Sequence, residues 1–449
     1  MSPAAGVKKH RRRIFVVKIR GACDKIPGAM TPFRAPEGTR DILPDEARRW
    51  RRLEEAARAA FDRFGYEEVR PPVFEYAALF QKSSGETTDI VEKEMFVFGD
   101  PEDPAGAYAL RPELTPGAVR AVLQENLFAR RGLWKLWYFG PAFRRERPQK
   151  GRYRQFTQLG VEVLGTSDPL ADVETMILFA EILREAGVAA WELRINSIGC
   201  AECRPAYREV LRRAIAPDLS RYCENCRRRF ERNVFRILDC KTPSCMERSS
   251  RLPAAIDYTC ERCRAHQRAV EAALRDAAVP FRADPRIVRG LDYYTRTVYE
   301  FSSSALGAQN ALAGGGRYDT LVRDMGGPDV GAVGFAAGAE RVLLAMGSEA
   351  AARVPDFFGA AVQADQRPAL FRLMTELRRA GFSGDMDYEG RSLKAQMREA
   401  HRSGARFALI LGPEEAAQGR VKIKDMKDGS ERTVGFEEAR AVLKGGKGT

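Results

Sequence analysis

The chain has 449 residues, of which 44% are hydrophobic, and it carries a formal net charge of +13 at pH 7. This length exceeds one typical hydrophobic core, so we expect a globular protein of two or three domains. No uninterrupted apolar run approaches the ~18 residues of a membrane span and no secretory signal is evident, which argues against a membrane partner and favours a cytoplasmic location.

The positive charge is concentrated near the amino terminus. Residues 1–29 carry eight Lys or Arg and one Asp, which accounts for +7 of the total and leaves the rest of the chain mildly basic. Such a leader has three interpretations: a disordered basic arm that binds nucleic acid, a targeting segment, or translation from an upstream start.

The next segment predicts a helix followed by an edge strand. After a start signal at Pro44, apolar side chains recur at helical spacing until Gly65 supplies a stop. These side chains are Trp50, Leu53, Ala57, Phe61 and Phe64. The following run, Tyr66 to Glu75, contains two prolines, which cannot donate to a strand ladder, so it belongs at a sheet edge or an interface.

Residues Arg111 to Thr115, with the sequence RPELT, precede a predicted helix over 118–127. On pattern alone Thr115 is a candidate helix N-cap, because a threonine oxygen can accept from the free N–H groups of the first turn.

The stretch from Gly140 to Val163 predicts a hairpin with a basic tip. Phe156, Gln158, Gly160 and Glu162 alternate with Thr157, Leu159, Val161 and Val163, which is the period of a half-buried strand. Leu136 and the residues from Tyr138 to Phe143 supply the partner strand. The tip, Arg144 to Arg154, is either a polyanion site, because guanidinium groups bind phosphate oxygens in pairs, or a solvated surface loop.

Eight of the nine cysteines fall between residues 200 and 263. They form the pairs Cys200/Cys203, Cys223/Cys226, Cys240/Cys245 and Cys260/Cys263. In a reducing cytoplasm this clustering indicates metal before disulfides, and eight thiols suffice for two tetrahedral zinc sites. The spacing leaves the partner of each pair open, allows His266 to replace one cysteine, and leaves free buried thiols or a redox couple as alternatives.

Two further segments carry arginines inside apolar patterns. Ile287 to Phe301 is rich in β-branched and aromatic residues and predicts a strand, in which Arg289 requires a carboxylate or phosphate partner. Gly334 to Met346 predicts a small-residue segment and a helix that carries Arg341. Between them, Gly314 to Gly316 indicate a tight turn; no Walker lysine and no GxGxxG motif is present.

From about Val354 short apolar strands alternate with helices, which predicts a separate α/β domain. The expected strands are 357–362, 407–411, 421–423 and 433–434, and the expected helices are 368–380 and 393–400. An Asp428-Gly429 pair marks the turn between the last two strands.

Three stretches together resemble the class II aminoacyl-tRNA synthetases. FRRERPQKGRYRQFTQ, from Phe143, resembles motif 2; GFAAGAERVLLAM, from Gly334, resembles motif 3; and VRGLDYY, from Val288, is similar to a signature of histidyl-tRNA synthetases. The class I signatures HIGH and KMSKS are absent. The resemblance covers roughly residues 33–445, and the cysteine-rich segment matches least well.

This resemblance implies an α+β fold: a class II catalytic core on an antiparallel sheet, interrupted by a cysteine-rich insertion and followed by an α/β anticodon-binding domain. The expected boundaries are 1–29 for the leader, 30–199 and 281–350 for the core, 200–280 for the insertion and 351–449 for the last domain. The segment around Pro72 resembles motif 1, which implies a homodimer. Met30 opens a stretch similar to the family's amino terminus, which favours an upstream start for the leader.

The resemblance also implies site residues. Arg144 would hold the α-phosphate of ATP, Arg289 the histidine carboxylate and the α-phosphate, and Arg341 the γ-phosphate, while Phe156 stacks on adenine. The histidine-binding residues would be Glu113, Leu114, Thr115 and Gln158 around the α-amino group, and Glu162, Tyr293 and Tyr294 around the imidazole.

Only three histidines occur, His10, His266 and His401, so a histidine-dependent triad in the core is excluded. Amino-acid activation needs none, because the substrate carboxylate is itself the nucleophile and the requirement is for fixed cations and Mg²⁺. The implied function is ATP-dependent charging of tRNA(His) with L-histidine, with structural zinc away from catalysis. Two rivals remain: the synthetase-like regulatory subunit of ATP phosphoribosyltransferase, disfavoured by the three arginines, and another class II synthetase, disfavoured by VRGLDYY.

Overall fold

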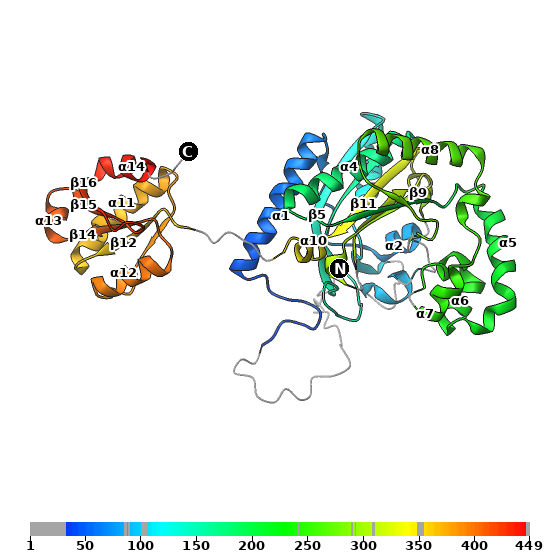
Figure 1. Cartoon of the computed structure of the whole chain (residues 1–449), viewed down its shortest axis with the longest axis horizontal. Coiled ribbons are helices and arrows are strands. Elements are labelled where there is room, and N and C mark those ends of the chain that lie inside the picture. Colours follow the sequence, from blue (N-terminus) through cyan, green and yellow to red (C-terminus); the bar gives the residue numbers. More distant parts are fainter. Residues whose placement is uncertain are drawn as a thin grey trace, which may run out of the picture. The chain divides into compact units, whose positions relative to one another are not determined.

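The computed structural model describes residues 33–84, 88, 90–99, 106–240, 242–288, 291, 293–307, 310–347 and 354–445 (Figure 1). The basic leader and Arg289 lie outside these described residues. The chain divides into two compact units, Met1–Ile42 with Leu53–Met346, and Leu43–Arg52 with Gly347–Thr449. Within the described ranges, none of the helices combines the length and apolar character that crossing a membrane requires.

The first unit is built on an eight-stranded sheet in the order β1-β5-β6-β11-β10-β9-β7-β8. Neighbours from β5 to β7 are antiparallel, whereas the edge strands β1 and β8 run parallel to β5 and β7. This confirms the predicted antiparallel core, and the prolines after β1 lie at its edge. The strands are β1 Glu67–Glu68, β5 Trp134–Phe143, β6 Gln155–Leu164, β7 Glu192–Ser197, β8 Arg282–Ala283, β9 Thr295–Ser302, β10 Ala311–Arg317 and β11 Ala332–Gly338.

Helices pack against this sheet and join its strands. Helix α1 (Pro44–Arg63) begins at the predicted proline, and its Phe61 ring stacks on Trp137 of β5 with centroids 4.8 Å apart. Helices α4 and α8 lie against each other, and they contact β11 and β9 respectively (Figure 1). The helices of this unit outside the insertion are α2 Ala77–Ser84, α3 Thr115–Gln124, α4 Pro169–Ala186, α9 Leu321–Asp324 and α10 Ala339–Ala345.

A second, small sheet has the order β2-β4-β3. Its strands are β2 Phe74–Tyr76, β3 Phe96–Phe98 and β4 Tyr108–Leu110. Aromatic side chains gather on it, and Phe74 and Tyr76 remain 53% and 57% exposed.

The cysteine-rich segment forms a helical insertion that leaves the large sheet after β7 and returns through α8. Its helices are α5 Arg204–Ile215, α6 Glu224–Arg232, α7 Pro243–Ser249 and α8 Glu261–Asp276, and its short 3-10 segments are η4 Ala216–Arg221, η5 Val234–Ile237 and η6 Ala255–Tyr258. A small core of its own includes Tyr207, Leu211 and Ile237.

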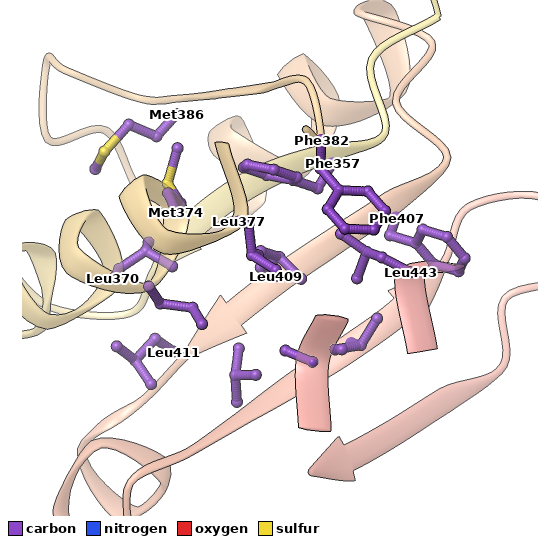
Figure 2. Close-up of a cluster of buried hydrophobic side chains, with 14 of the residues drawn as sticks. Phe357, Leu370, Met374, Leu377, Phe382, Met386, Phe407, Leu409, Leu411 and Leu443 are labelled. Carbon is purple, nitrogen blue, oxygen red and sulfur yellow. The ribbon is translucent and has the colours of Figure 1, made fainter. Parts of the chain in front are cut away.

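The second unit contains a five-stranded sheet in the order β13-β12-β14-β15-β16. Its elements are β12 Phe357–Ala361, α11 Arg367–Arg379, β13 Gly384–Met386, α12 Leu393–Arg402, β14 Phe407–Leu411, α13 Pro413–Ala417, β15 Arg420–Asp425, β16 Glu431–Gly435 and α14 Phe436–Gly445. Figure 2 shows side chains of α11, such as Leu370 and Met374, near Leu409 of β14 in its buried core. The predicted α/β alternation is confirmed; β13, α13 and α14 were not predicted.

Three local predictions were wrong. Gly314 to Gly316 form no tight turn; they lie within β10, between β9 and β11. The predicted strand 287–301 begins only at Thr295, because the rings of Tyr293 and Tyr294 pack with Tyr318 before the ladder starts. The N-cap of α3 is Leu114 without a side-chain cap bond, and Thr115 is the first helical residue.

Candidate active site

A cavity of about 810 Å³ lies in the first unit, walled by the β5–β6 hairpin, the residues just before β9, strands β10 and β11, α10 and part of the insertion. It brings together nearly all predicted site residues within the described part of the chain. Those that line it are Glu113, Thr115, Arg144, Phe156, Gln158, Glu162, Tyr293, Tyr294 and Arg341. Leu114 differs, because its side chain packs in a core cluster with Ala118 and Tyr138.

Glu162 is the most enclosed acid of the cavity, with 1% of its surface exposed. Its carboxylate accepts from the hydroxyls of Thr115 at 2.6 Å, of Tyr138 at 3.0 Å, and of Tyr318. Thr115 is therefore occupied by a tertiary partner, which explains why it does not cap its own helix.

The protonation of Glu162 is set by two opposing effects. Burial raises the pKa of Glu162, and the three hydroxyl donors lower it because they favour the charged form. Burial is the larger effect, and the resulting pKa is about 8. Nearby Glu113 adds to the increase. With a pKa of about 8, Glu162 is mostly protonated near neutral pH, beside hydroxyls that can reorganise around a polar ligand.

The sequence analysis missed Tyr138 and Tyr318, the two phenols bonded to Glu162. Tyr138 lies directly opposite Gly160 in the β5–β6 ladder. A glycine inside a strand marks a close approach of another group, and a Cβ at Gly160 would lie 2.5 Å from the Tyr138 hydroxyl. In the sequence, Gly160 could have indicated that a side chain such as Tyr138 packs against it. The contact of Tyr318 with Glu162 depends on the order of the strands in the sheet, which the sequence does not show.

Glycines on adjacent strands make the floor beneath these groups. A Cβ at Gly334, which faces Glu162 in the β6–β11 ladder, would lie 2.3 Å from Glu162 Oε2. On β10, a Cβ at Gly315 would lie 2.4 Å from the Tyr299 ring, and one at Gly316 2.9 Å from the Tyr294 ring. Gly160, Gly316 and Gly334, called the glycine floor below, leave room for Tyr138, Tyr294 and Glu162 on the cavity face of the sheet, whereas Gly315 leaves room for Tyr299 on the opposite face.

A second polar group lies beside the first. The Tyr293 hydroxyl donates to Glu113 Oε2 at 3.2 Å. Gln158 is buried at the cavity wall, and within the described residues its Oε1 has no hydrogen-bond partner. An orphaned buried carbonyl oxygen is costly unless a ligand donates to it, so this position is suited to an ammonium or amide donor.

The cationic part of the cavity is fixed by backbone contacts. Arg144 Nε donates to the Pro112 carbonyl at 2.9 Å, and the guanidinium lies 5.2 Å from the Phe156 ring centroid. Arg341 donates to the carbonyls of Gly151 at 3.2 Å and Ala311 at 3.0 Å, which connects α10 to the hairpin tip and to β10. Both guanidiniums are thereby held at the wall, where they favour an anionic ligand.

Two buried arginines support the walls. Arg111 donates to the carbonyls of Pro141 at 2.7 Å and Pro72 at 3.1 Å, which ties the RPELT loop to β5 and to the edge segment. Arg317, next to Tyr318, is fully buried and pairs with Asp172 of α4. His266 of α8 lies 3.2 Å from the same carboxylate. His266 is thus engaged with Asp172 and does not replace a cysteine.

The cysteines resolve into two groups of four, and the sulfurs of each group lie within 4.8 Å of one another. Cys200, Cys203, Cys260 and Cys263 form the neck cluster, where the insertion leaves and rejoins the sheet; Cys223, Cys226, Cys240 and Cys245 form the tip cluster. Either group could hold a metal ion. The sequence analysis placed the zinc away from catalysis. The tip cluster differs from that expectation, because Cys223 and Cys240 line the cavity.

Comparison with known proteins gives two family matches. A family model of histidyl-tRNA synthetase matches residues 38–342, and an anticodon binding domain matches residues 356–445. The first match covers more than half of the chain and includes every lining residue of the cavity.

Individual relatives agree over nearly the whole length. The chain is 46% identical to a histidine–tRNA ligase of Geobacter metallireducens over 398 residues, which cover 89% of this chain and 96% of the relative. It is 46% identical to that of Anaeromyxobacter dehalogenans over 412 residues, 91% and 99% of the two chains. The crystal structure of apo histidyl-tRNA synthetase from S. aureus superposes with a TM-score of 0.77 at 31% identity, covering 92% of this chain and 100% of that one.

Proposed function

Because the chain belongs to the histidyl-tRNA synthetase family, we propose that its cavity is the place where histidine is activated with ATP and passed to tRNA(His). The chain is a histidine–tRNA ligase, an aminoacyl-tRNA ligase with a class II fold. The observation that carries the site proposal is the buried Glu162 with its three hydroxyl donors in the same cavity as Arg144 and Arg341. Both rival functions are disfavoured, since these full-length relatives are histidine–tRNA ligases.

We propose that the imidazole binds between Glu162 and Tyr294, with Tyr293 beside them. A neutral imidazole has one nitrogen that donates and one that accepts a hydrogen bond. A carboxyl group and a phenol can satisfy both, because each of them can donate its proton or accept one. The proton that burial keeps on Glu162 supports this, since it can be shared with the ring without bringing a second charge into the cavity. An apolar amino acid would leave these groups unpaired and would be rejected.

The α-amino group is proposed to lie against Glu113 and Gln158. Gln158 Oε1 lacks a partner within the described residues, and Glu113 lines the same wall. The Thr115 oxygen can accept from the ammonium while its proton goes to Glu162. Leu114, whose side chain is in the core, would contribute only its backbone.

For ATP, the proposed contacts are adenine on Phe156, the α-phosphate on Arg144 and the γ-phosphate on Arg341. Arg289, assigned from the motif alone, would neutralise the histidine carboxylate and the α-phosphate. The carboxylate then attacks the α-phosphorus and pyrophosphate leaves; next a ribose hydroxyl of the tRNA attacks the activated carbonyl and AMP leaves. The chain's own contribution is positioning and charge neutralisation.

Mg²⁺ and zinc are the metals that we propose. Mg²⁺ is commonly held by one or two carboxylates together with substrate phosphates, and Glu146 and Glu340 line the cavity on the hairpin tip and α10. Bound there, Mg²⁺ would neutralise charge on the phosphates. For the two cysteine clusters we propose zinc, which four thiolates at tetrahedral spacing favour.

We propose that the anticodon-binding domain, 351–449, contacts tRNA(His), and that the core comprises 30–199 and 281–350 around the insertion 200–280. Residues 1–29 are proposed to be a dispensable leader. We place the enzyme in the cytoplasm, because tRNA charging serves translation.

Histidine-dependent exchange between ATP and pyrophosphate tests the function directly. Exchange is expected with histidine and not with proline or threonine, because the latter two cannot pair with both Glu162 and Tyr294. Exchange that needs no amino acid, or that proline supports equally, would contradict the proposal.

We further propose that the small sheet is a homodimer contact. Phe74 of β2 packs edge-on against Tyr108 of β4 with centroids 5.9 Å apart, and Tyr76 stacks on Tyr108 at 5.2 Å. Phe98 of β3 adjoins the same cluster. An aromatic patch of this kind on a sheet marks an interaction surface, and its place after the Pro72 segment agrees with the motif 1 resemblance.

The double variant Phe74→Glu/Tyr76→Glu is expected to be a monomer of 50.1 kDa, since four acids would face each other across a twofold contact. We expect the dimer to weaken by at least about 100-fold, the effect of losing a central aromatic pair. Light scattering over a range of concentrations measures this. Phe371→Glu, which alters an equally exposed phenylalanine in the second unit, is the control and should remain dimeric; a dimeric double variant would remove the small sheet from the interface.

A further inference from the structure

The sulfur positions of both cysteine clusters fit metal coordination and do not fit disulfides. Cys200 and Cys203 Sγ are 3.6 Å apart, Cys203 and Cys263 Sγ 3.9 Å, and Cys223 and Cys240 Sγ 3.9 Å. A tetrahedron with zinc–sulfur bonds of about 2.3 Å has edges of about 3.8 Å, whereas a disulfide requires about 2.0 Å. All eight thiols are free, so each group has the dimensions of a tetrathiolate site.

Backbone groups around the sulfurs repeat between the two clusters. The Cys260 N–H donates to Cys203 Sγ at 3.1 Å in the neck cluster, and the Cys223 N–H donates to Cys245 Sγ at 3.2 Å in the tip cluster. Cys203, Cys223 and Cys260 are each the N-cap of a helix. N–H donors and helix amino termini stabilise thiolates, which are the form that binds metal.

The neck cluster is attached directly to the histidine side of the cavity. Ile198 N–H donates to the Arg296 carbonyl and Arg296 N–H to the Gly199 carbonyl, both at 2.8 Å, so the residues leading to Cys200 pair with the start of β9. Arg204, after Cys203, donates to the Tyr294 carbonyl at 3.4 Å. The neck therefore joins the insertion to the backbone that carries Tyr294.

The tip cluster organises a wall of the cavity. Between its cysteines, Asn225, Arg229, Arg236 and Asp239 line the cavity. Arg229 of α6 donates to the Arg236 carbonyl of η5 at 3.1 Å, which links the two segments that follow Cys223/Cys226 and precede Cys240. The hydrophobic core of the insertion contains Cys226, Cys240 and Cys245 as members, so the cysteines of the tip cluster are part of the packing that holds this wall.

From these observations we infer that the tip cluster binds a zinc ion that positions a wall of the substrate cavity, while the neck zinc joins the insertion to the sheet. The inference rests on the proposed function for the identity of the substrate. Arg229 and Arg236 present positive charge on that wall, so the tip zinc is a positioning element for the anionic substrate, ATP. Removing it should loosen the wall without disturbing Glu162, whose partners all lie outside the insertion.

Zinc content of the full chain, purified without chelator, tests the sites. We expect two zinc ions per chain in the parental protein and one in Cys245→Ser, whose sulfur is buried and does not line the cavity. Cys23→Ser, the same chemical change at the cysteine outside both clusters, should retain two. Less than about 0.2 zinc per parental chain, with all eight cluster thiols titratable in addition to Cys23, would overturn both sites.

The positioning role is tested on the same variants. In Cys245→Ser the KM for ATP is expected to rise about tenfold in pyrophosphate exchange, with the KM for histidine within about threefold of the parental value, because only uniform ATP binding is lost. A variant that has lost one zinc and keeps the parental KM for ATP would overturn the role. Cys23→Ser should have parental kinetics.

Hydrogen exchange supplies a readout that is independent of activity. Treating the parental chain with a chelator is expected to remove protection over residues 222–250 while β5 and β6 remain protected, and it needs no variant to fold. Unchanged protection of the tip would contradict a zinc-organised wall. If the parental chain lacked histidine-dependent exchange, the proposed function would fail, whereas zinc content and protection would still decide the metal sites.

Discussion

Replacing Arg144 with alanine is expected to slow histidine-dependent pyrophosphate exchange by about 10²–10³ while the protein stays folded. The rate falls because negative charge on the α-phosphate oxygens must be stabilised in the transition state, and a fixed donor at such a position is worth this factor. Folding is spared, since the side chain loses one hydrogen bond to the Pro112 carbonyl and a ring contact with Phe156, a loss of about 1 kcal/mol.

The matched control is Arg147→Ala, because Arg147 lies in the same basic loop and is exposed. It removes the same charge from the hairpin tip and should stay within about threefold of the parental rate, since a solvent-exposed charge contributes little. Equal losses in the two variants would mean that the loop acts through its total charge, and a parental rate for Arg144→Ala would remove Arg144 from the reaction.

Glu162→Gln is expected to raise the KM for histidine about 10²-fold and to leave the KM for ATP within a few-fold. The amide keeps the shape of the acid but has only one acceptor oxygen for the hydroxyls of Thr115, Tyr138 and Tyr318, and its NH₂ group faces the remaining hydroxyls. The imidazole therefore loses its partner, and the side chain loses the hydrogen bonds that hold it. Leaving a buried hydrogen-bonding group without its partner costs about 1–3 kcal/mol, which corresponds to this range. Tyr294→Phe should act in the same direction and less strongly.

Steady-state pyrophosphate exchange, with histidine and ATP varied separately, measures the two KM values. Glu174→Gln is the control, because Glu174 accepts from the Tyr66 hydroxyl at 3.0 Å and does not line the cavity. It should leave both KM values near parental. A Glu162→Gln variant in which both KM values rise equally would indicate that Glu162 holds the cavity together and does not recognise the imidazole.

The β5–β6 hairpin shows what the sequence could predict. Its alternation from Phe156 to Val163 correctly predicted a strand with one face toward the site, because successive side chains of a strand point to opposite faces. The expected half-burial was wrong, since both faces of β6 are buried from Gln158 to Leu164. The fold class followed from the same patterns and from the family resemblance. Side chains that share a strand face, such as Gln158 and Glu162, were therefore placed together correctly.

The sequence could not predict contacts between residues that lie on different strands. Gly314 to Gly316 suggest a turn when read alone, and only the neighbours of β10 show that Tyr299 fills the space at Gly315 on one face and Tyr294 the space at Gly316 on the other. Tyr318, which follows the end of β10, donates to Glu162, 156 positions away in sequence. The pairing of the cysteines was undetermined for the same reason, since spacing sets the local pairs and the fold joins Cys203 to Cys260 and Cys263.

The glycine floor limits how this protein can change over evolutionary time. At Gly160, Gly316 and Gly334 every substitution adds at least a methyl group, whose carbon would lie 2.2–2.5 Å from a backbone oxygen. No smaller residue exists, so no other amino acid fits these three positions, and a compensating change elsewhere cannot remove a backbone atom. The shape of the cavity around Glu162 is therefore set by the main chain of three strands, and substitutions at these positions would destroy that shape more readily than adjust it.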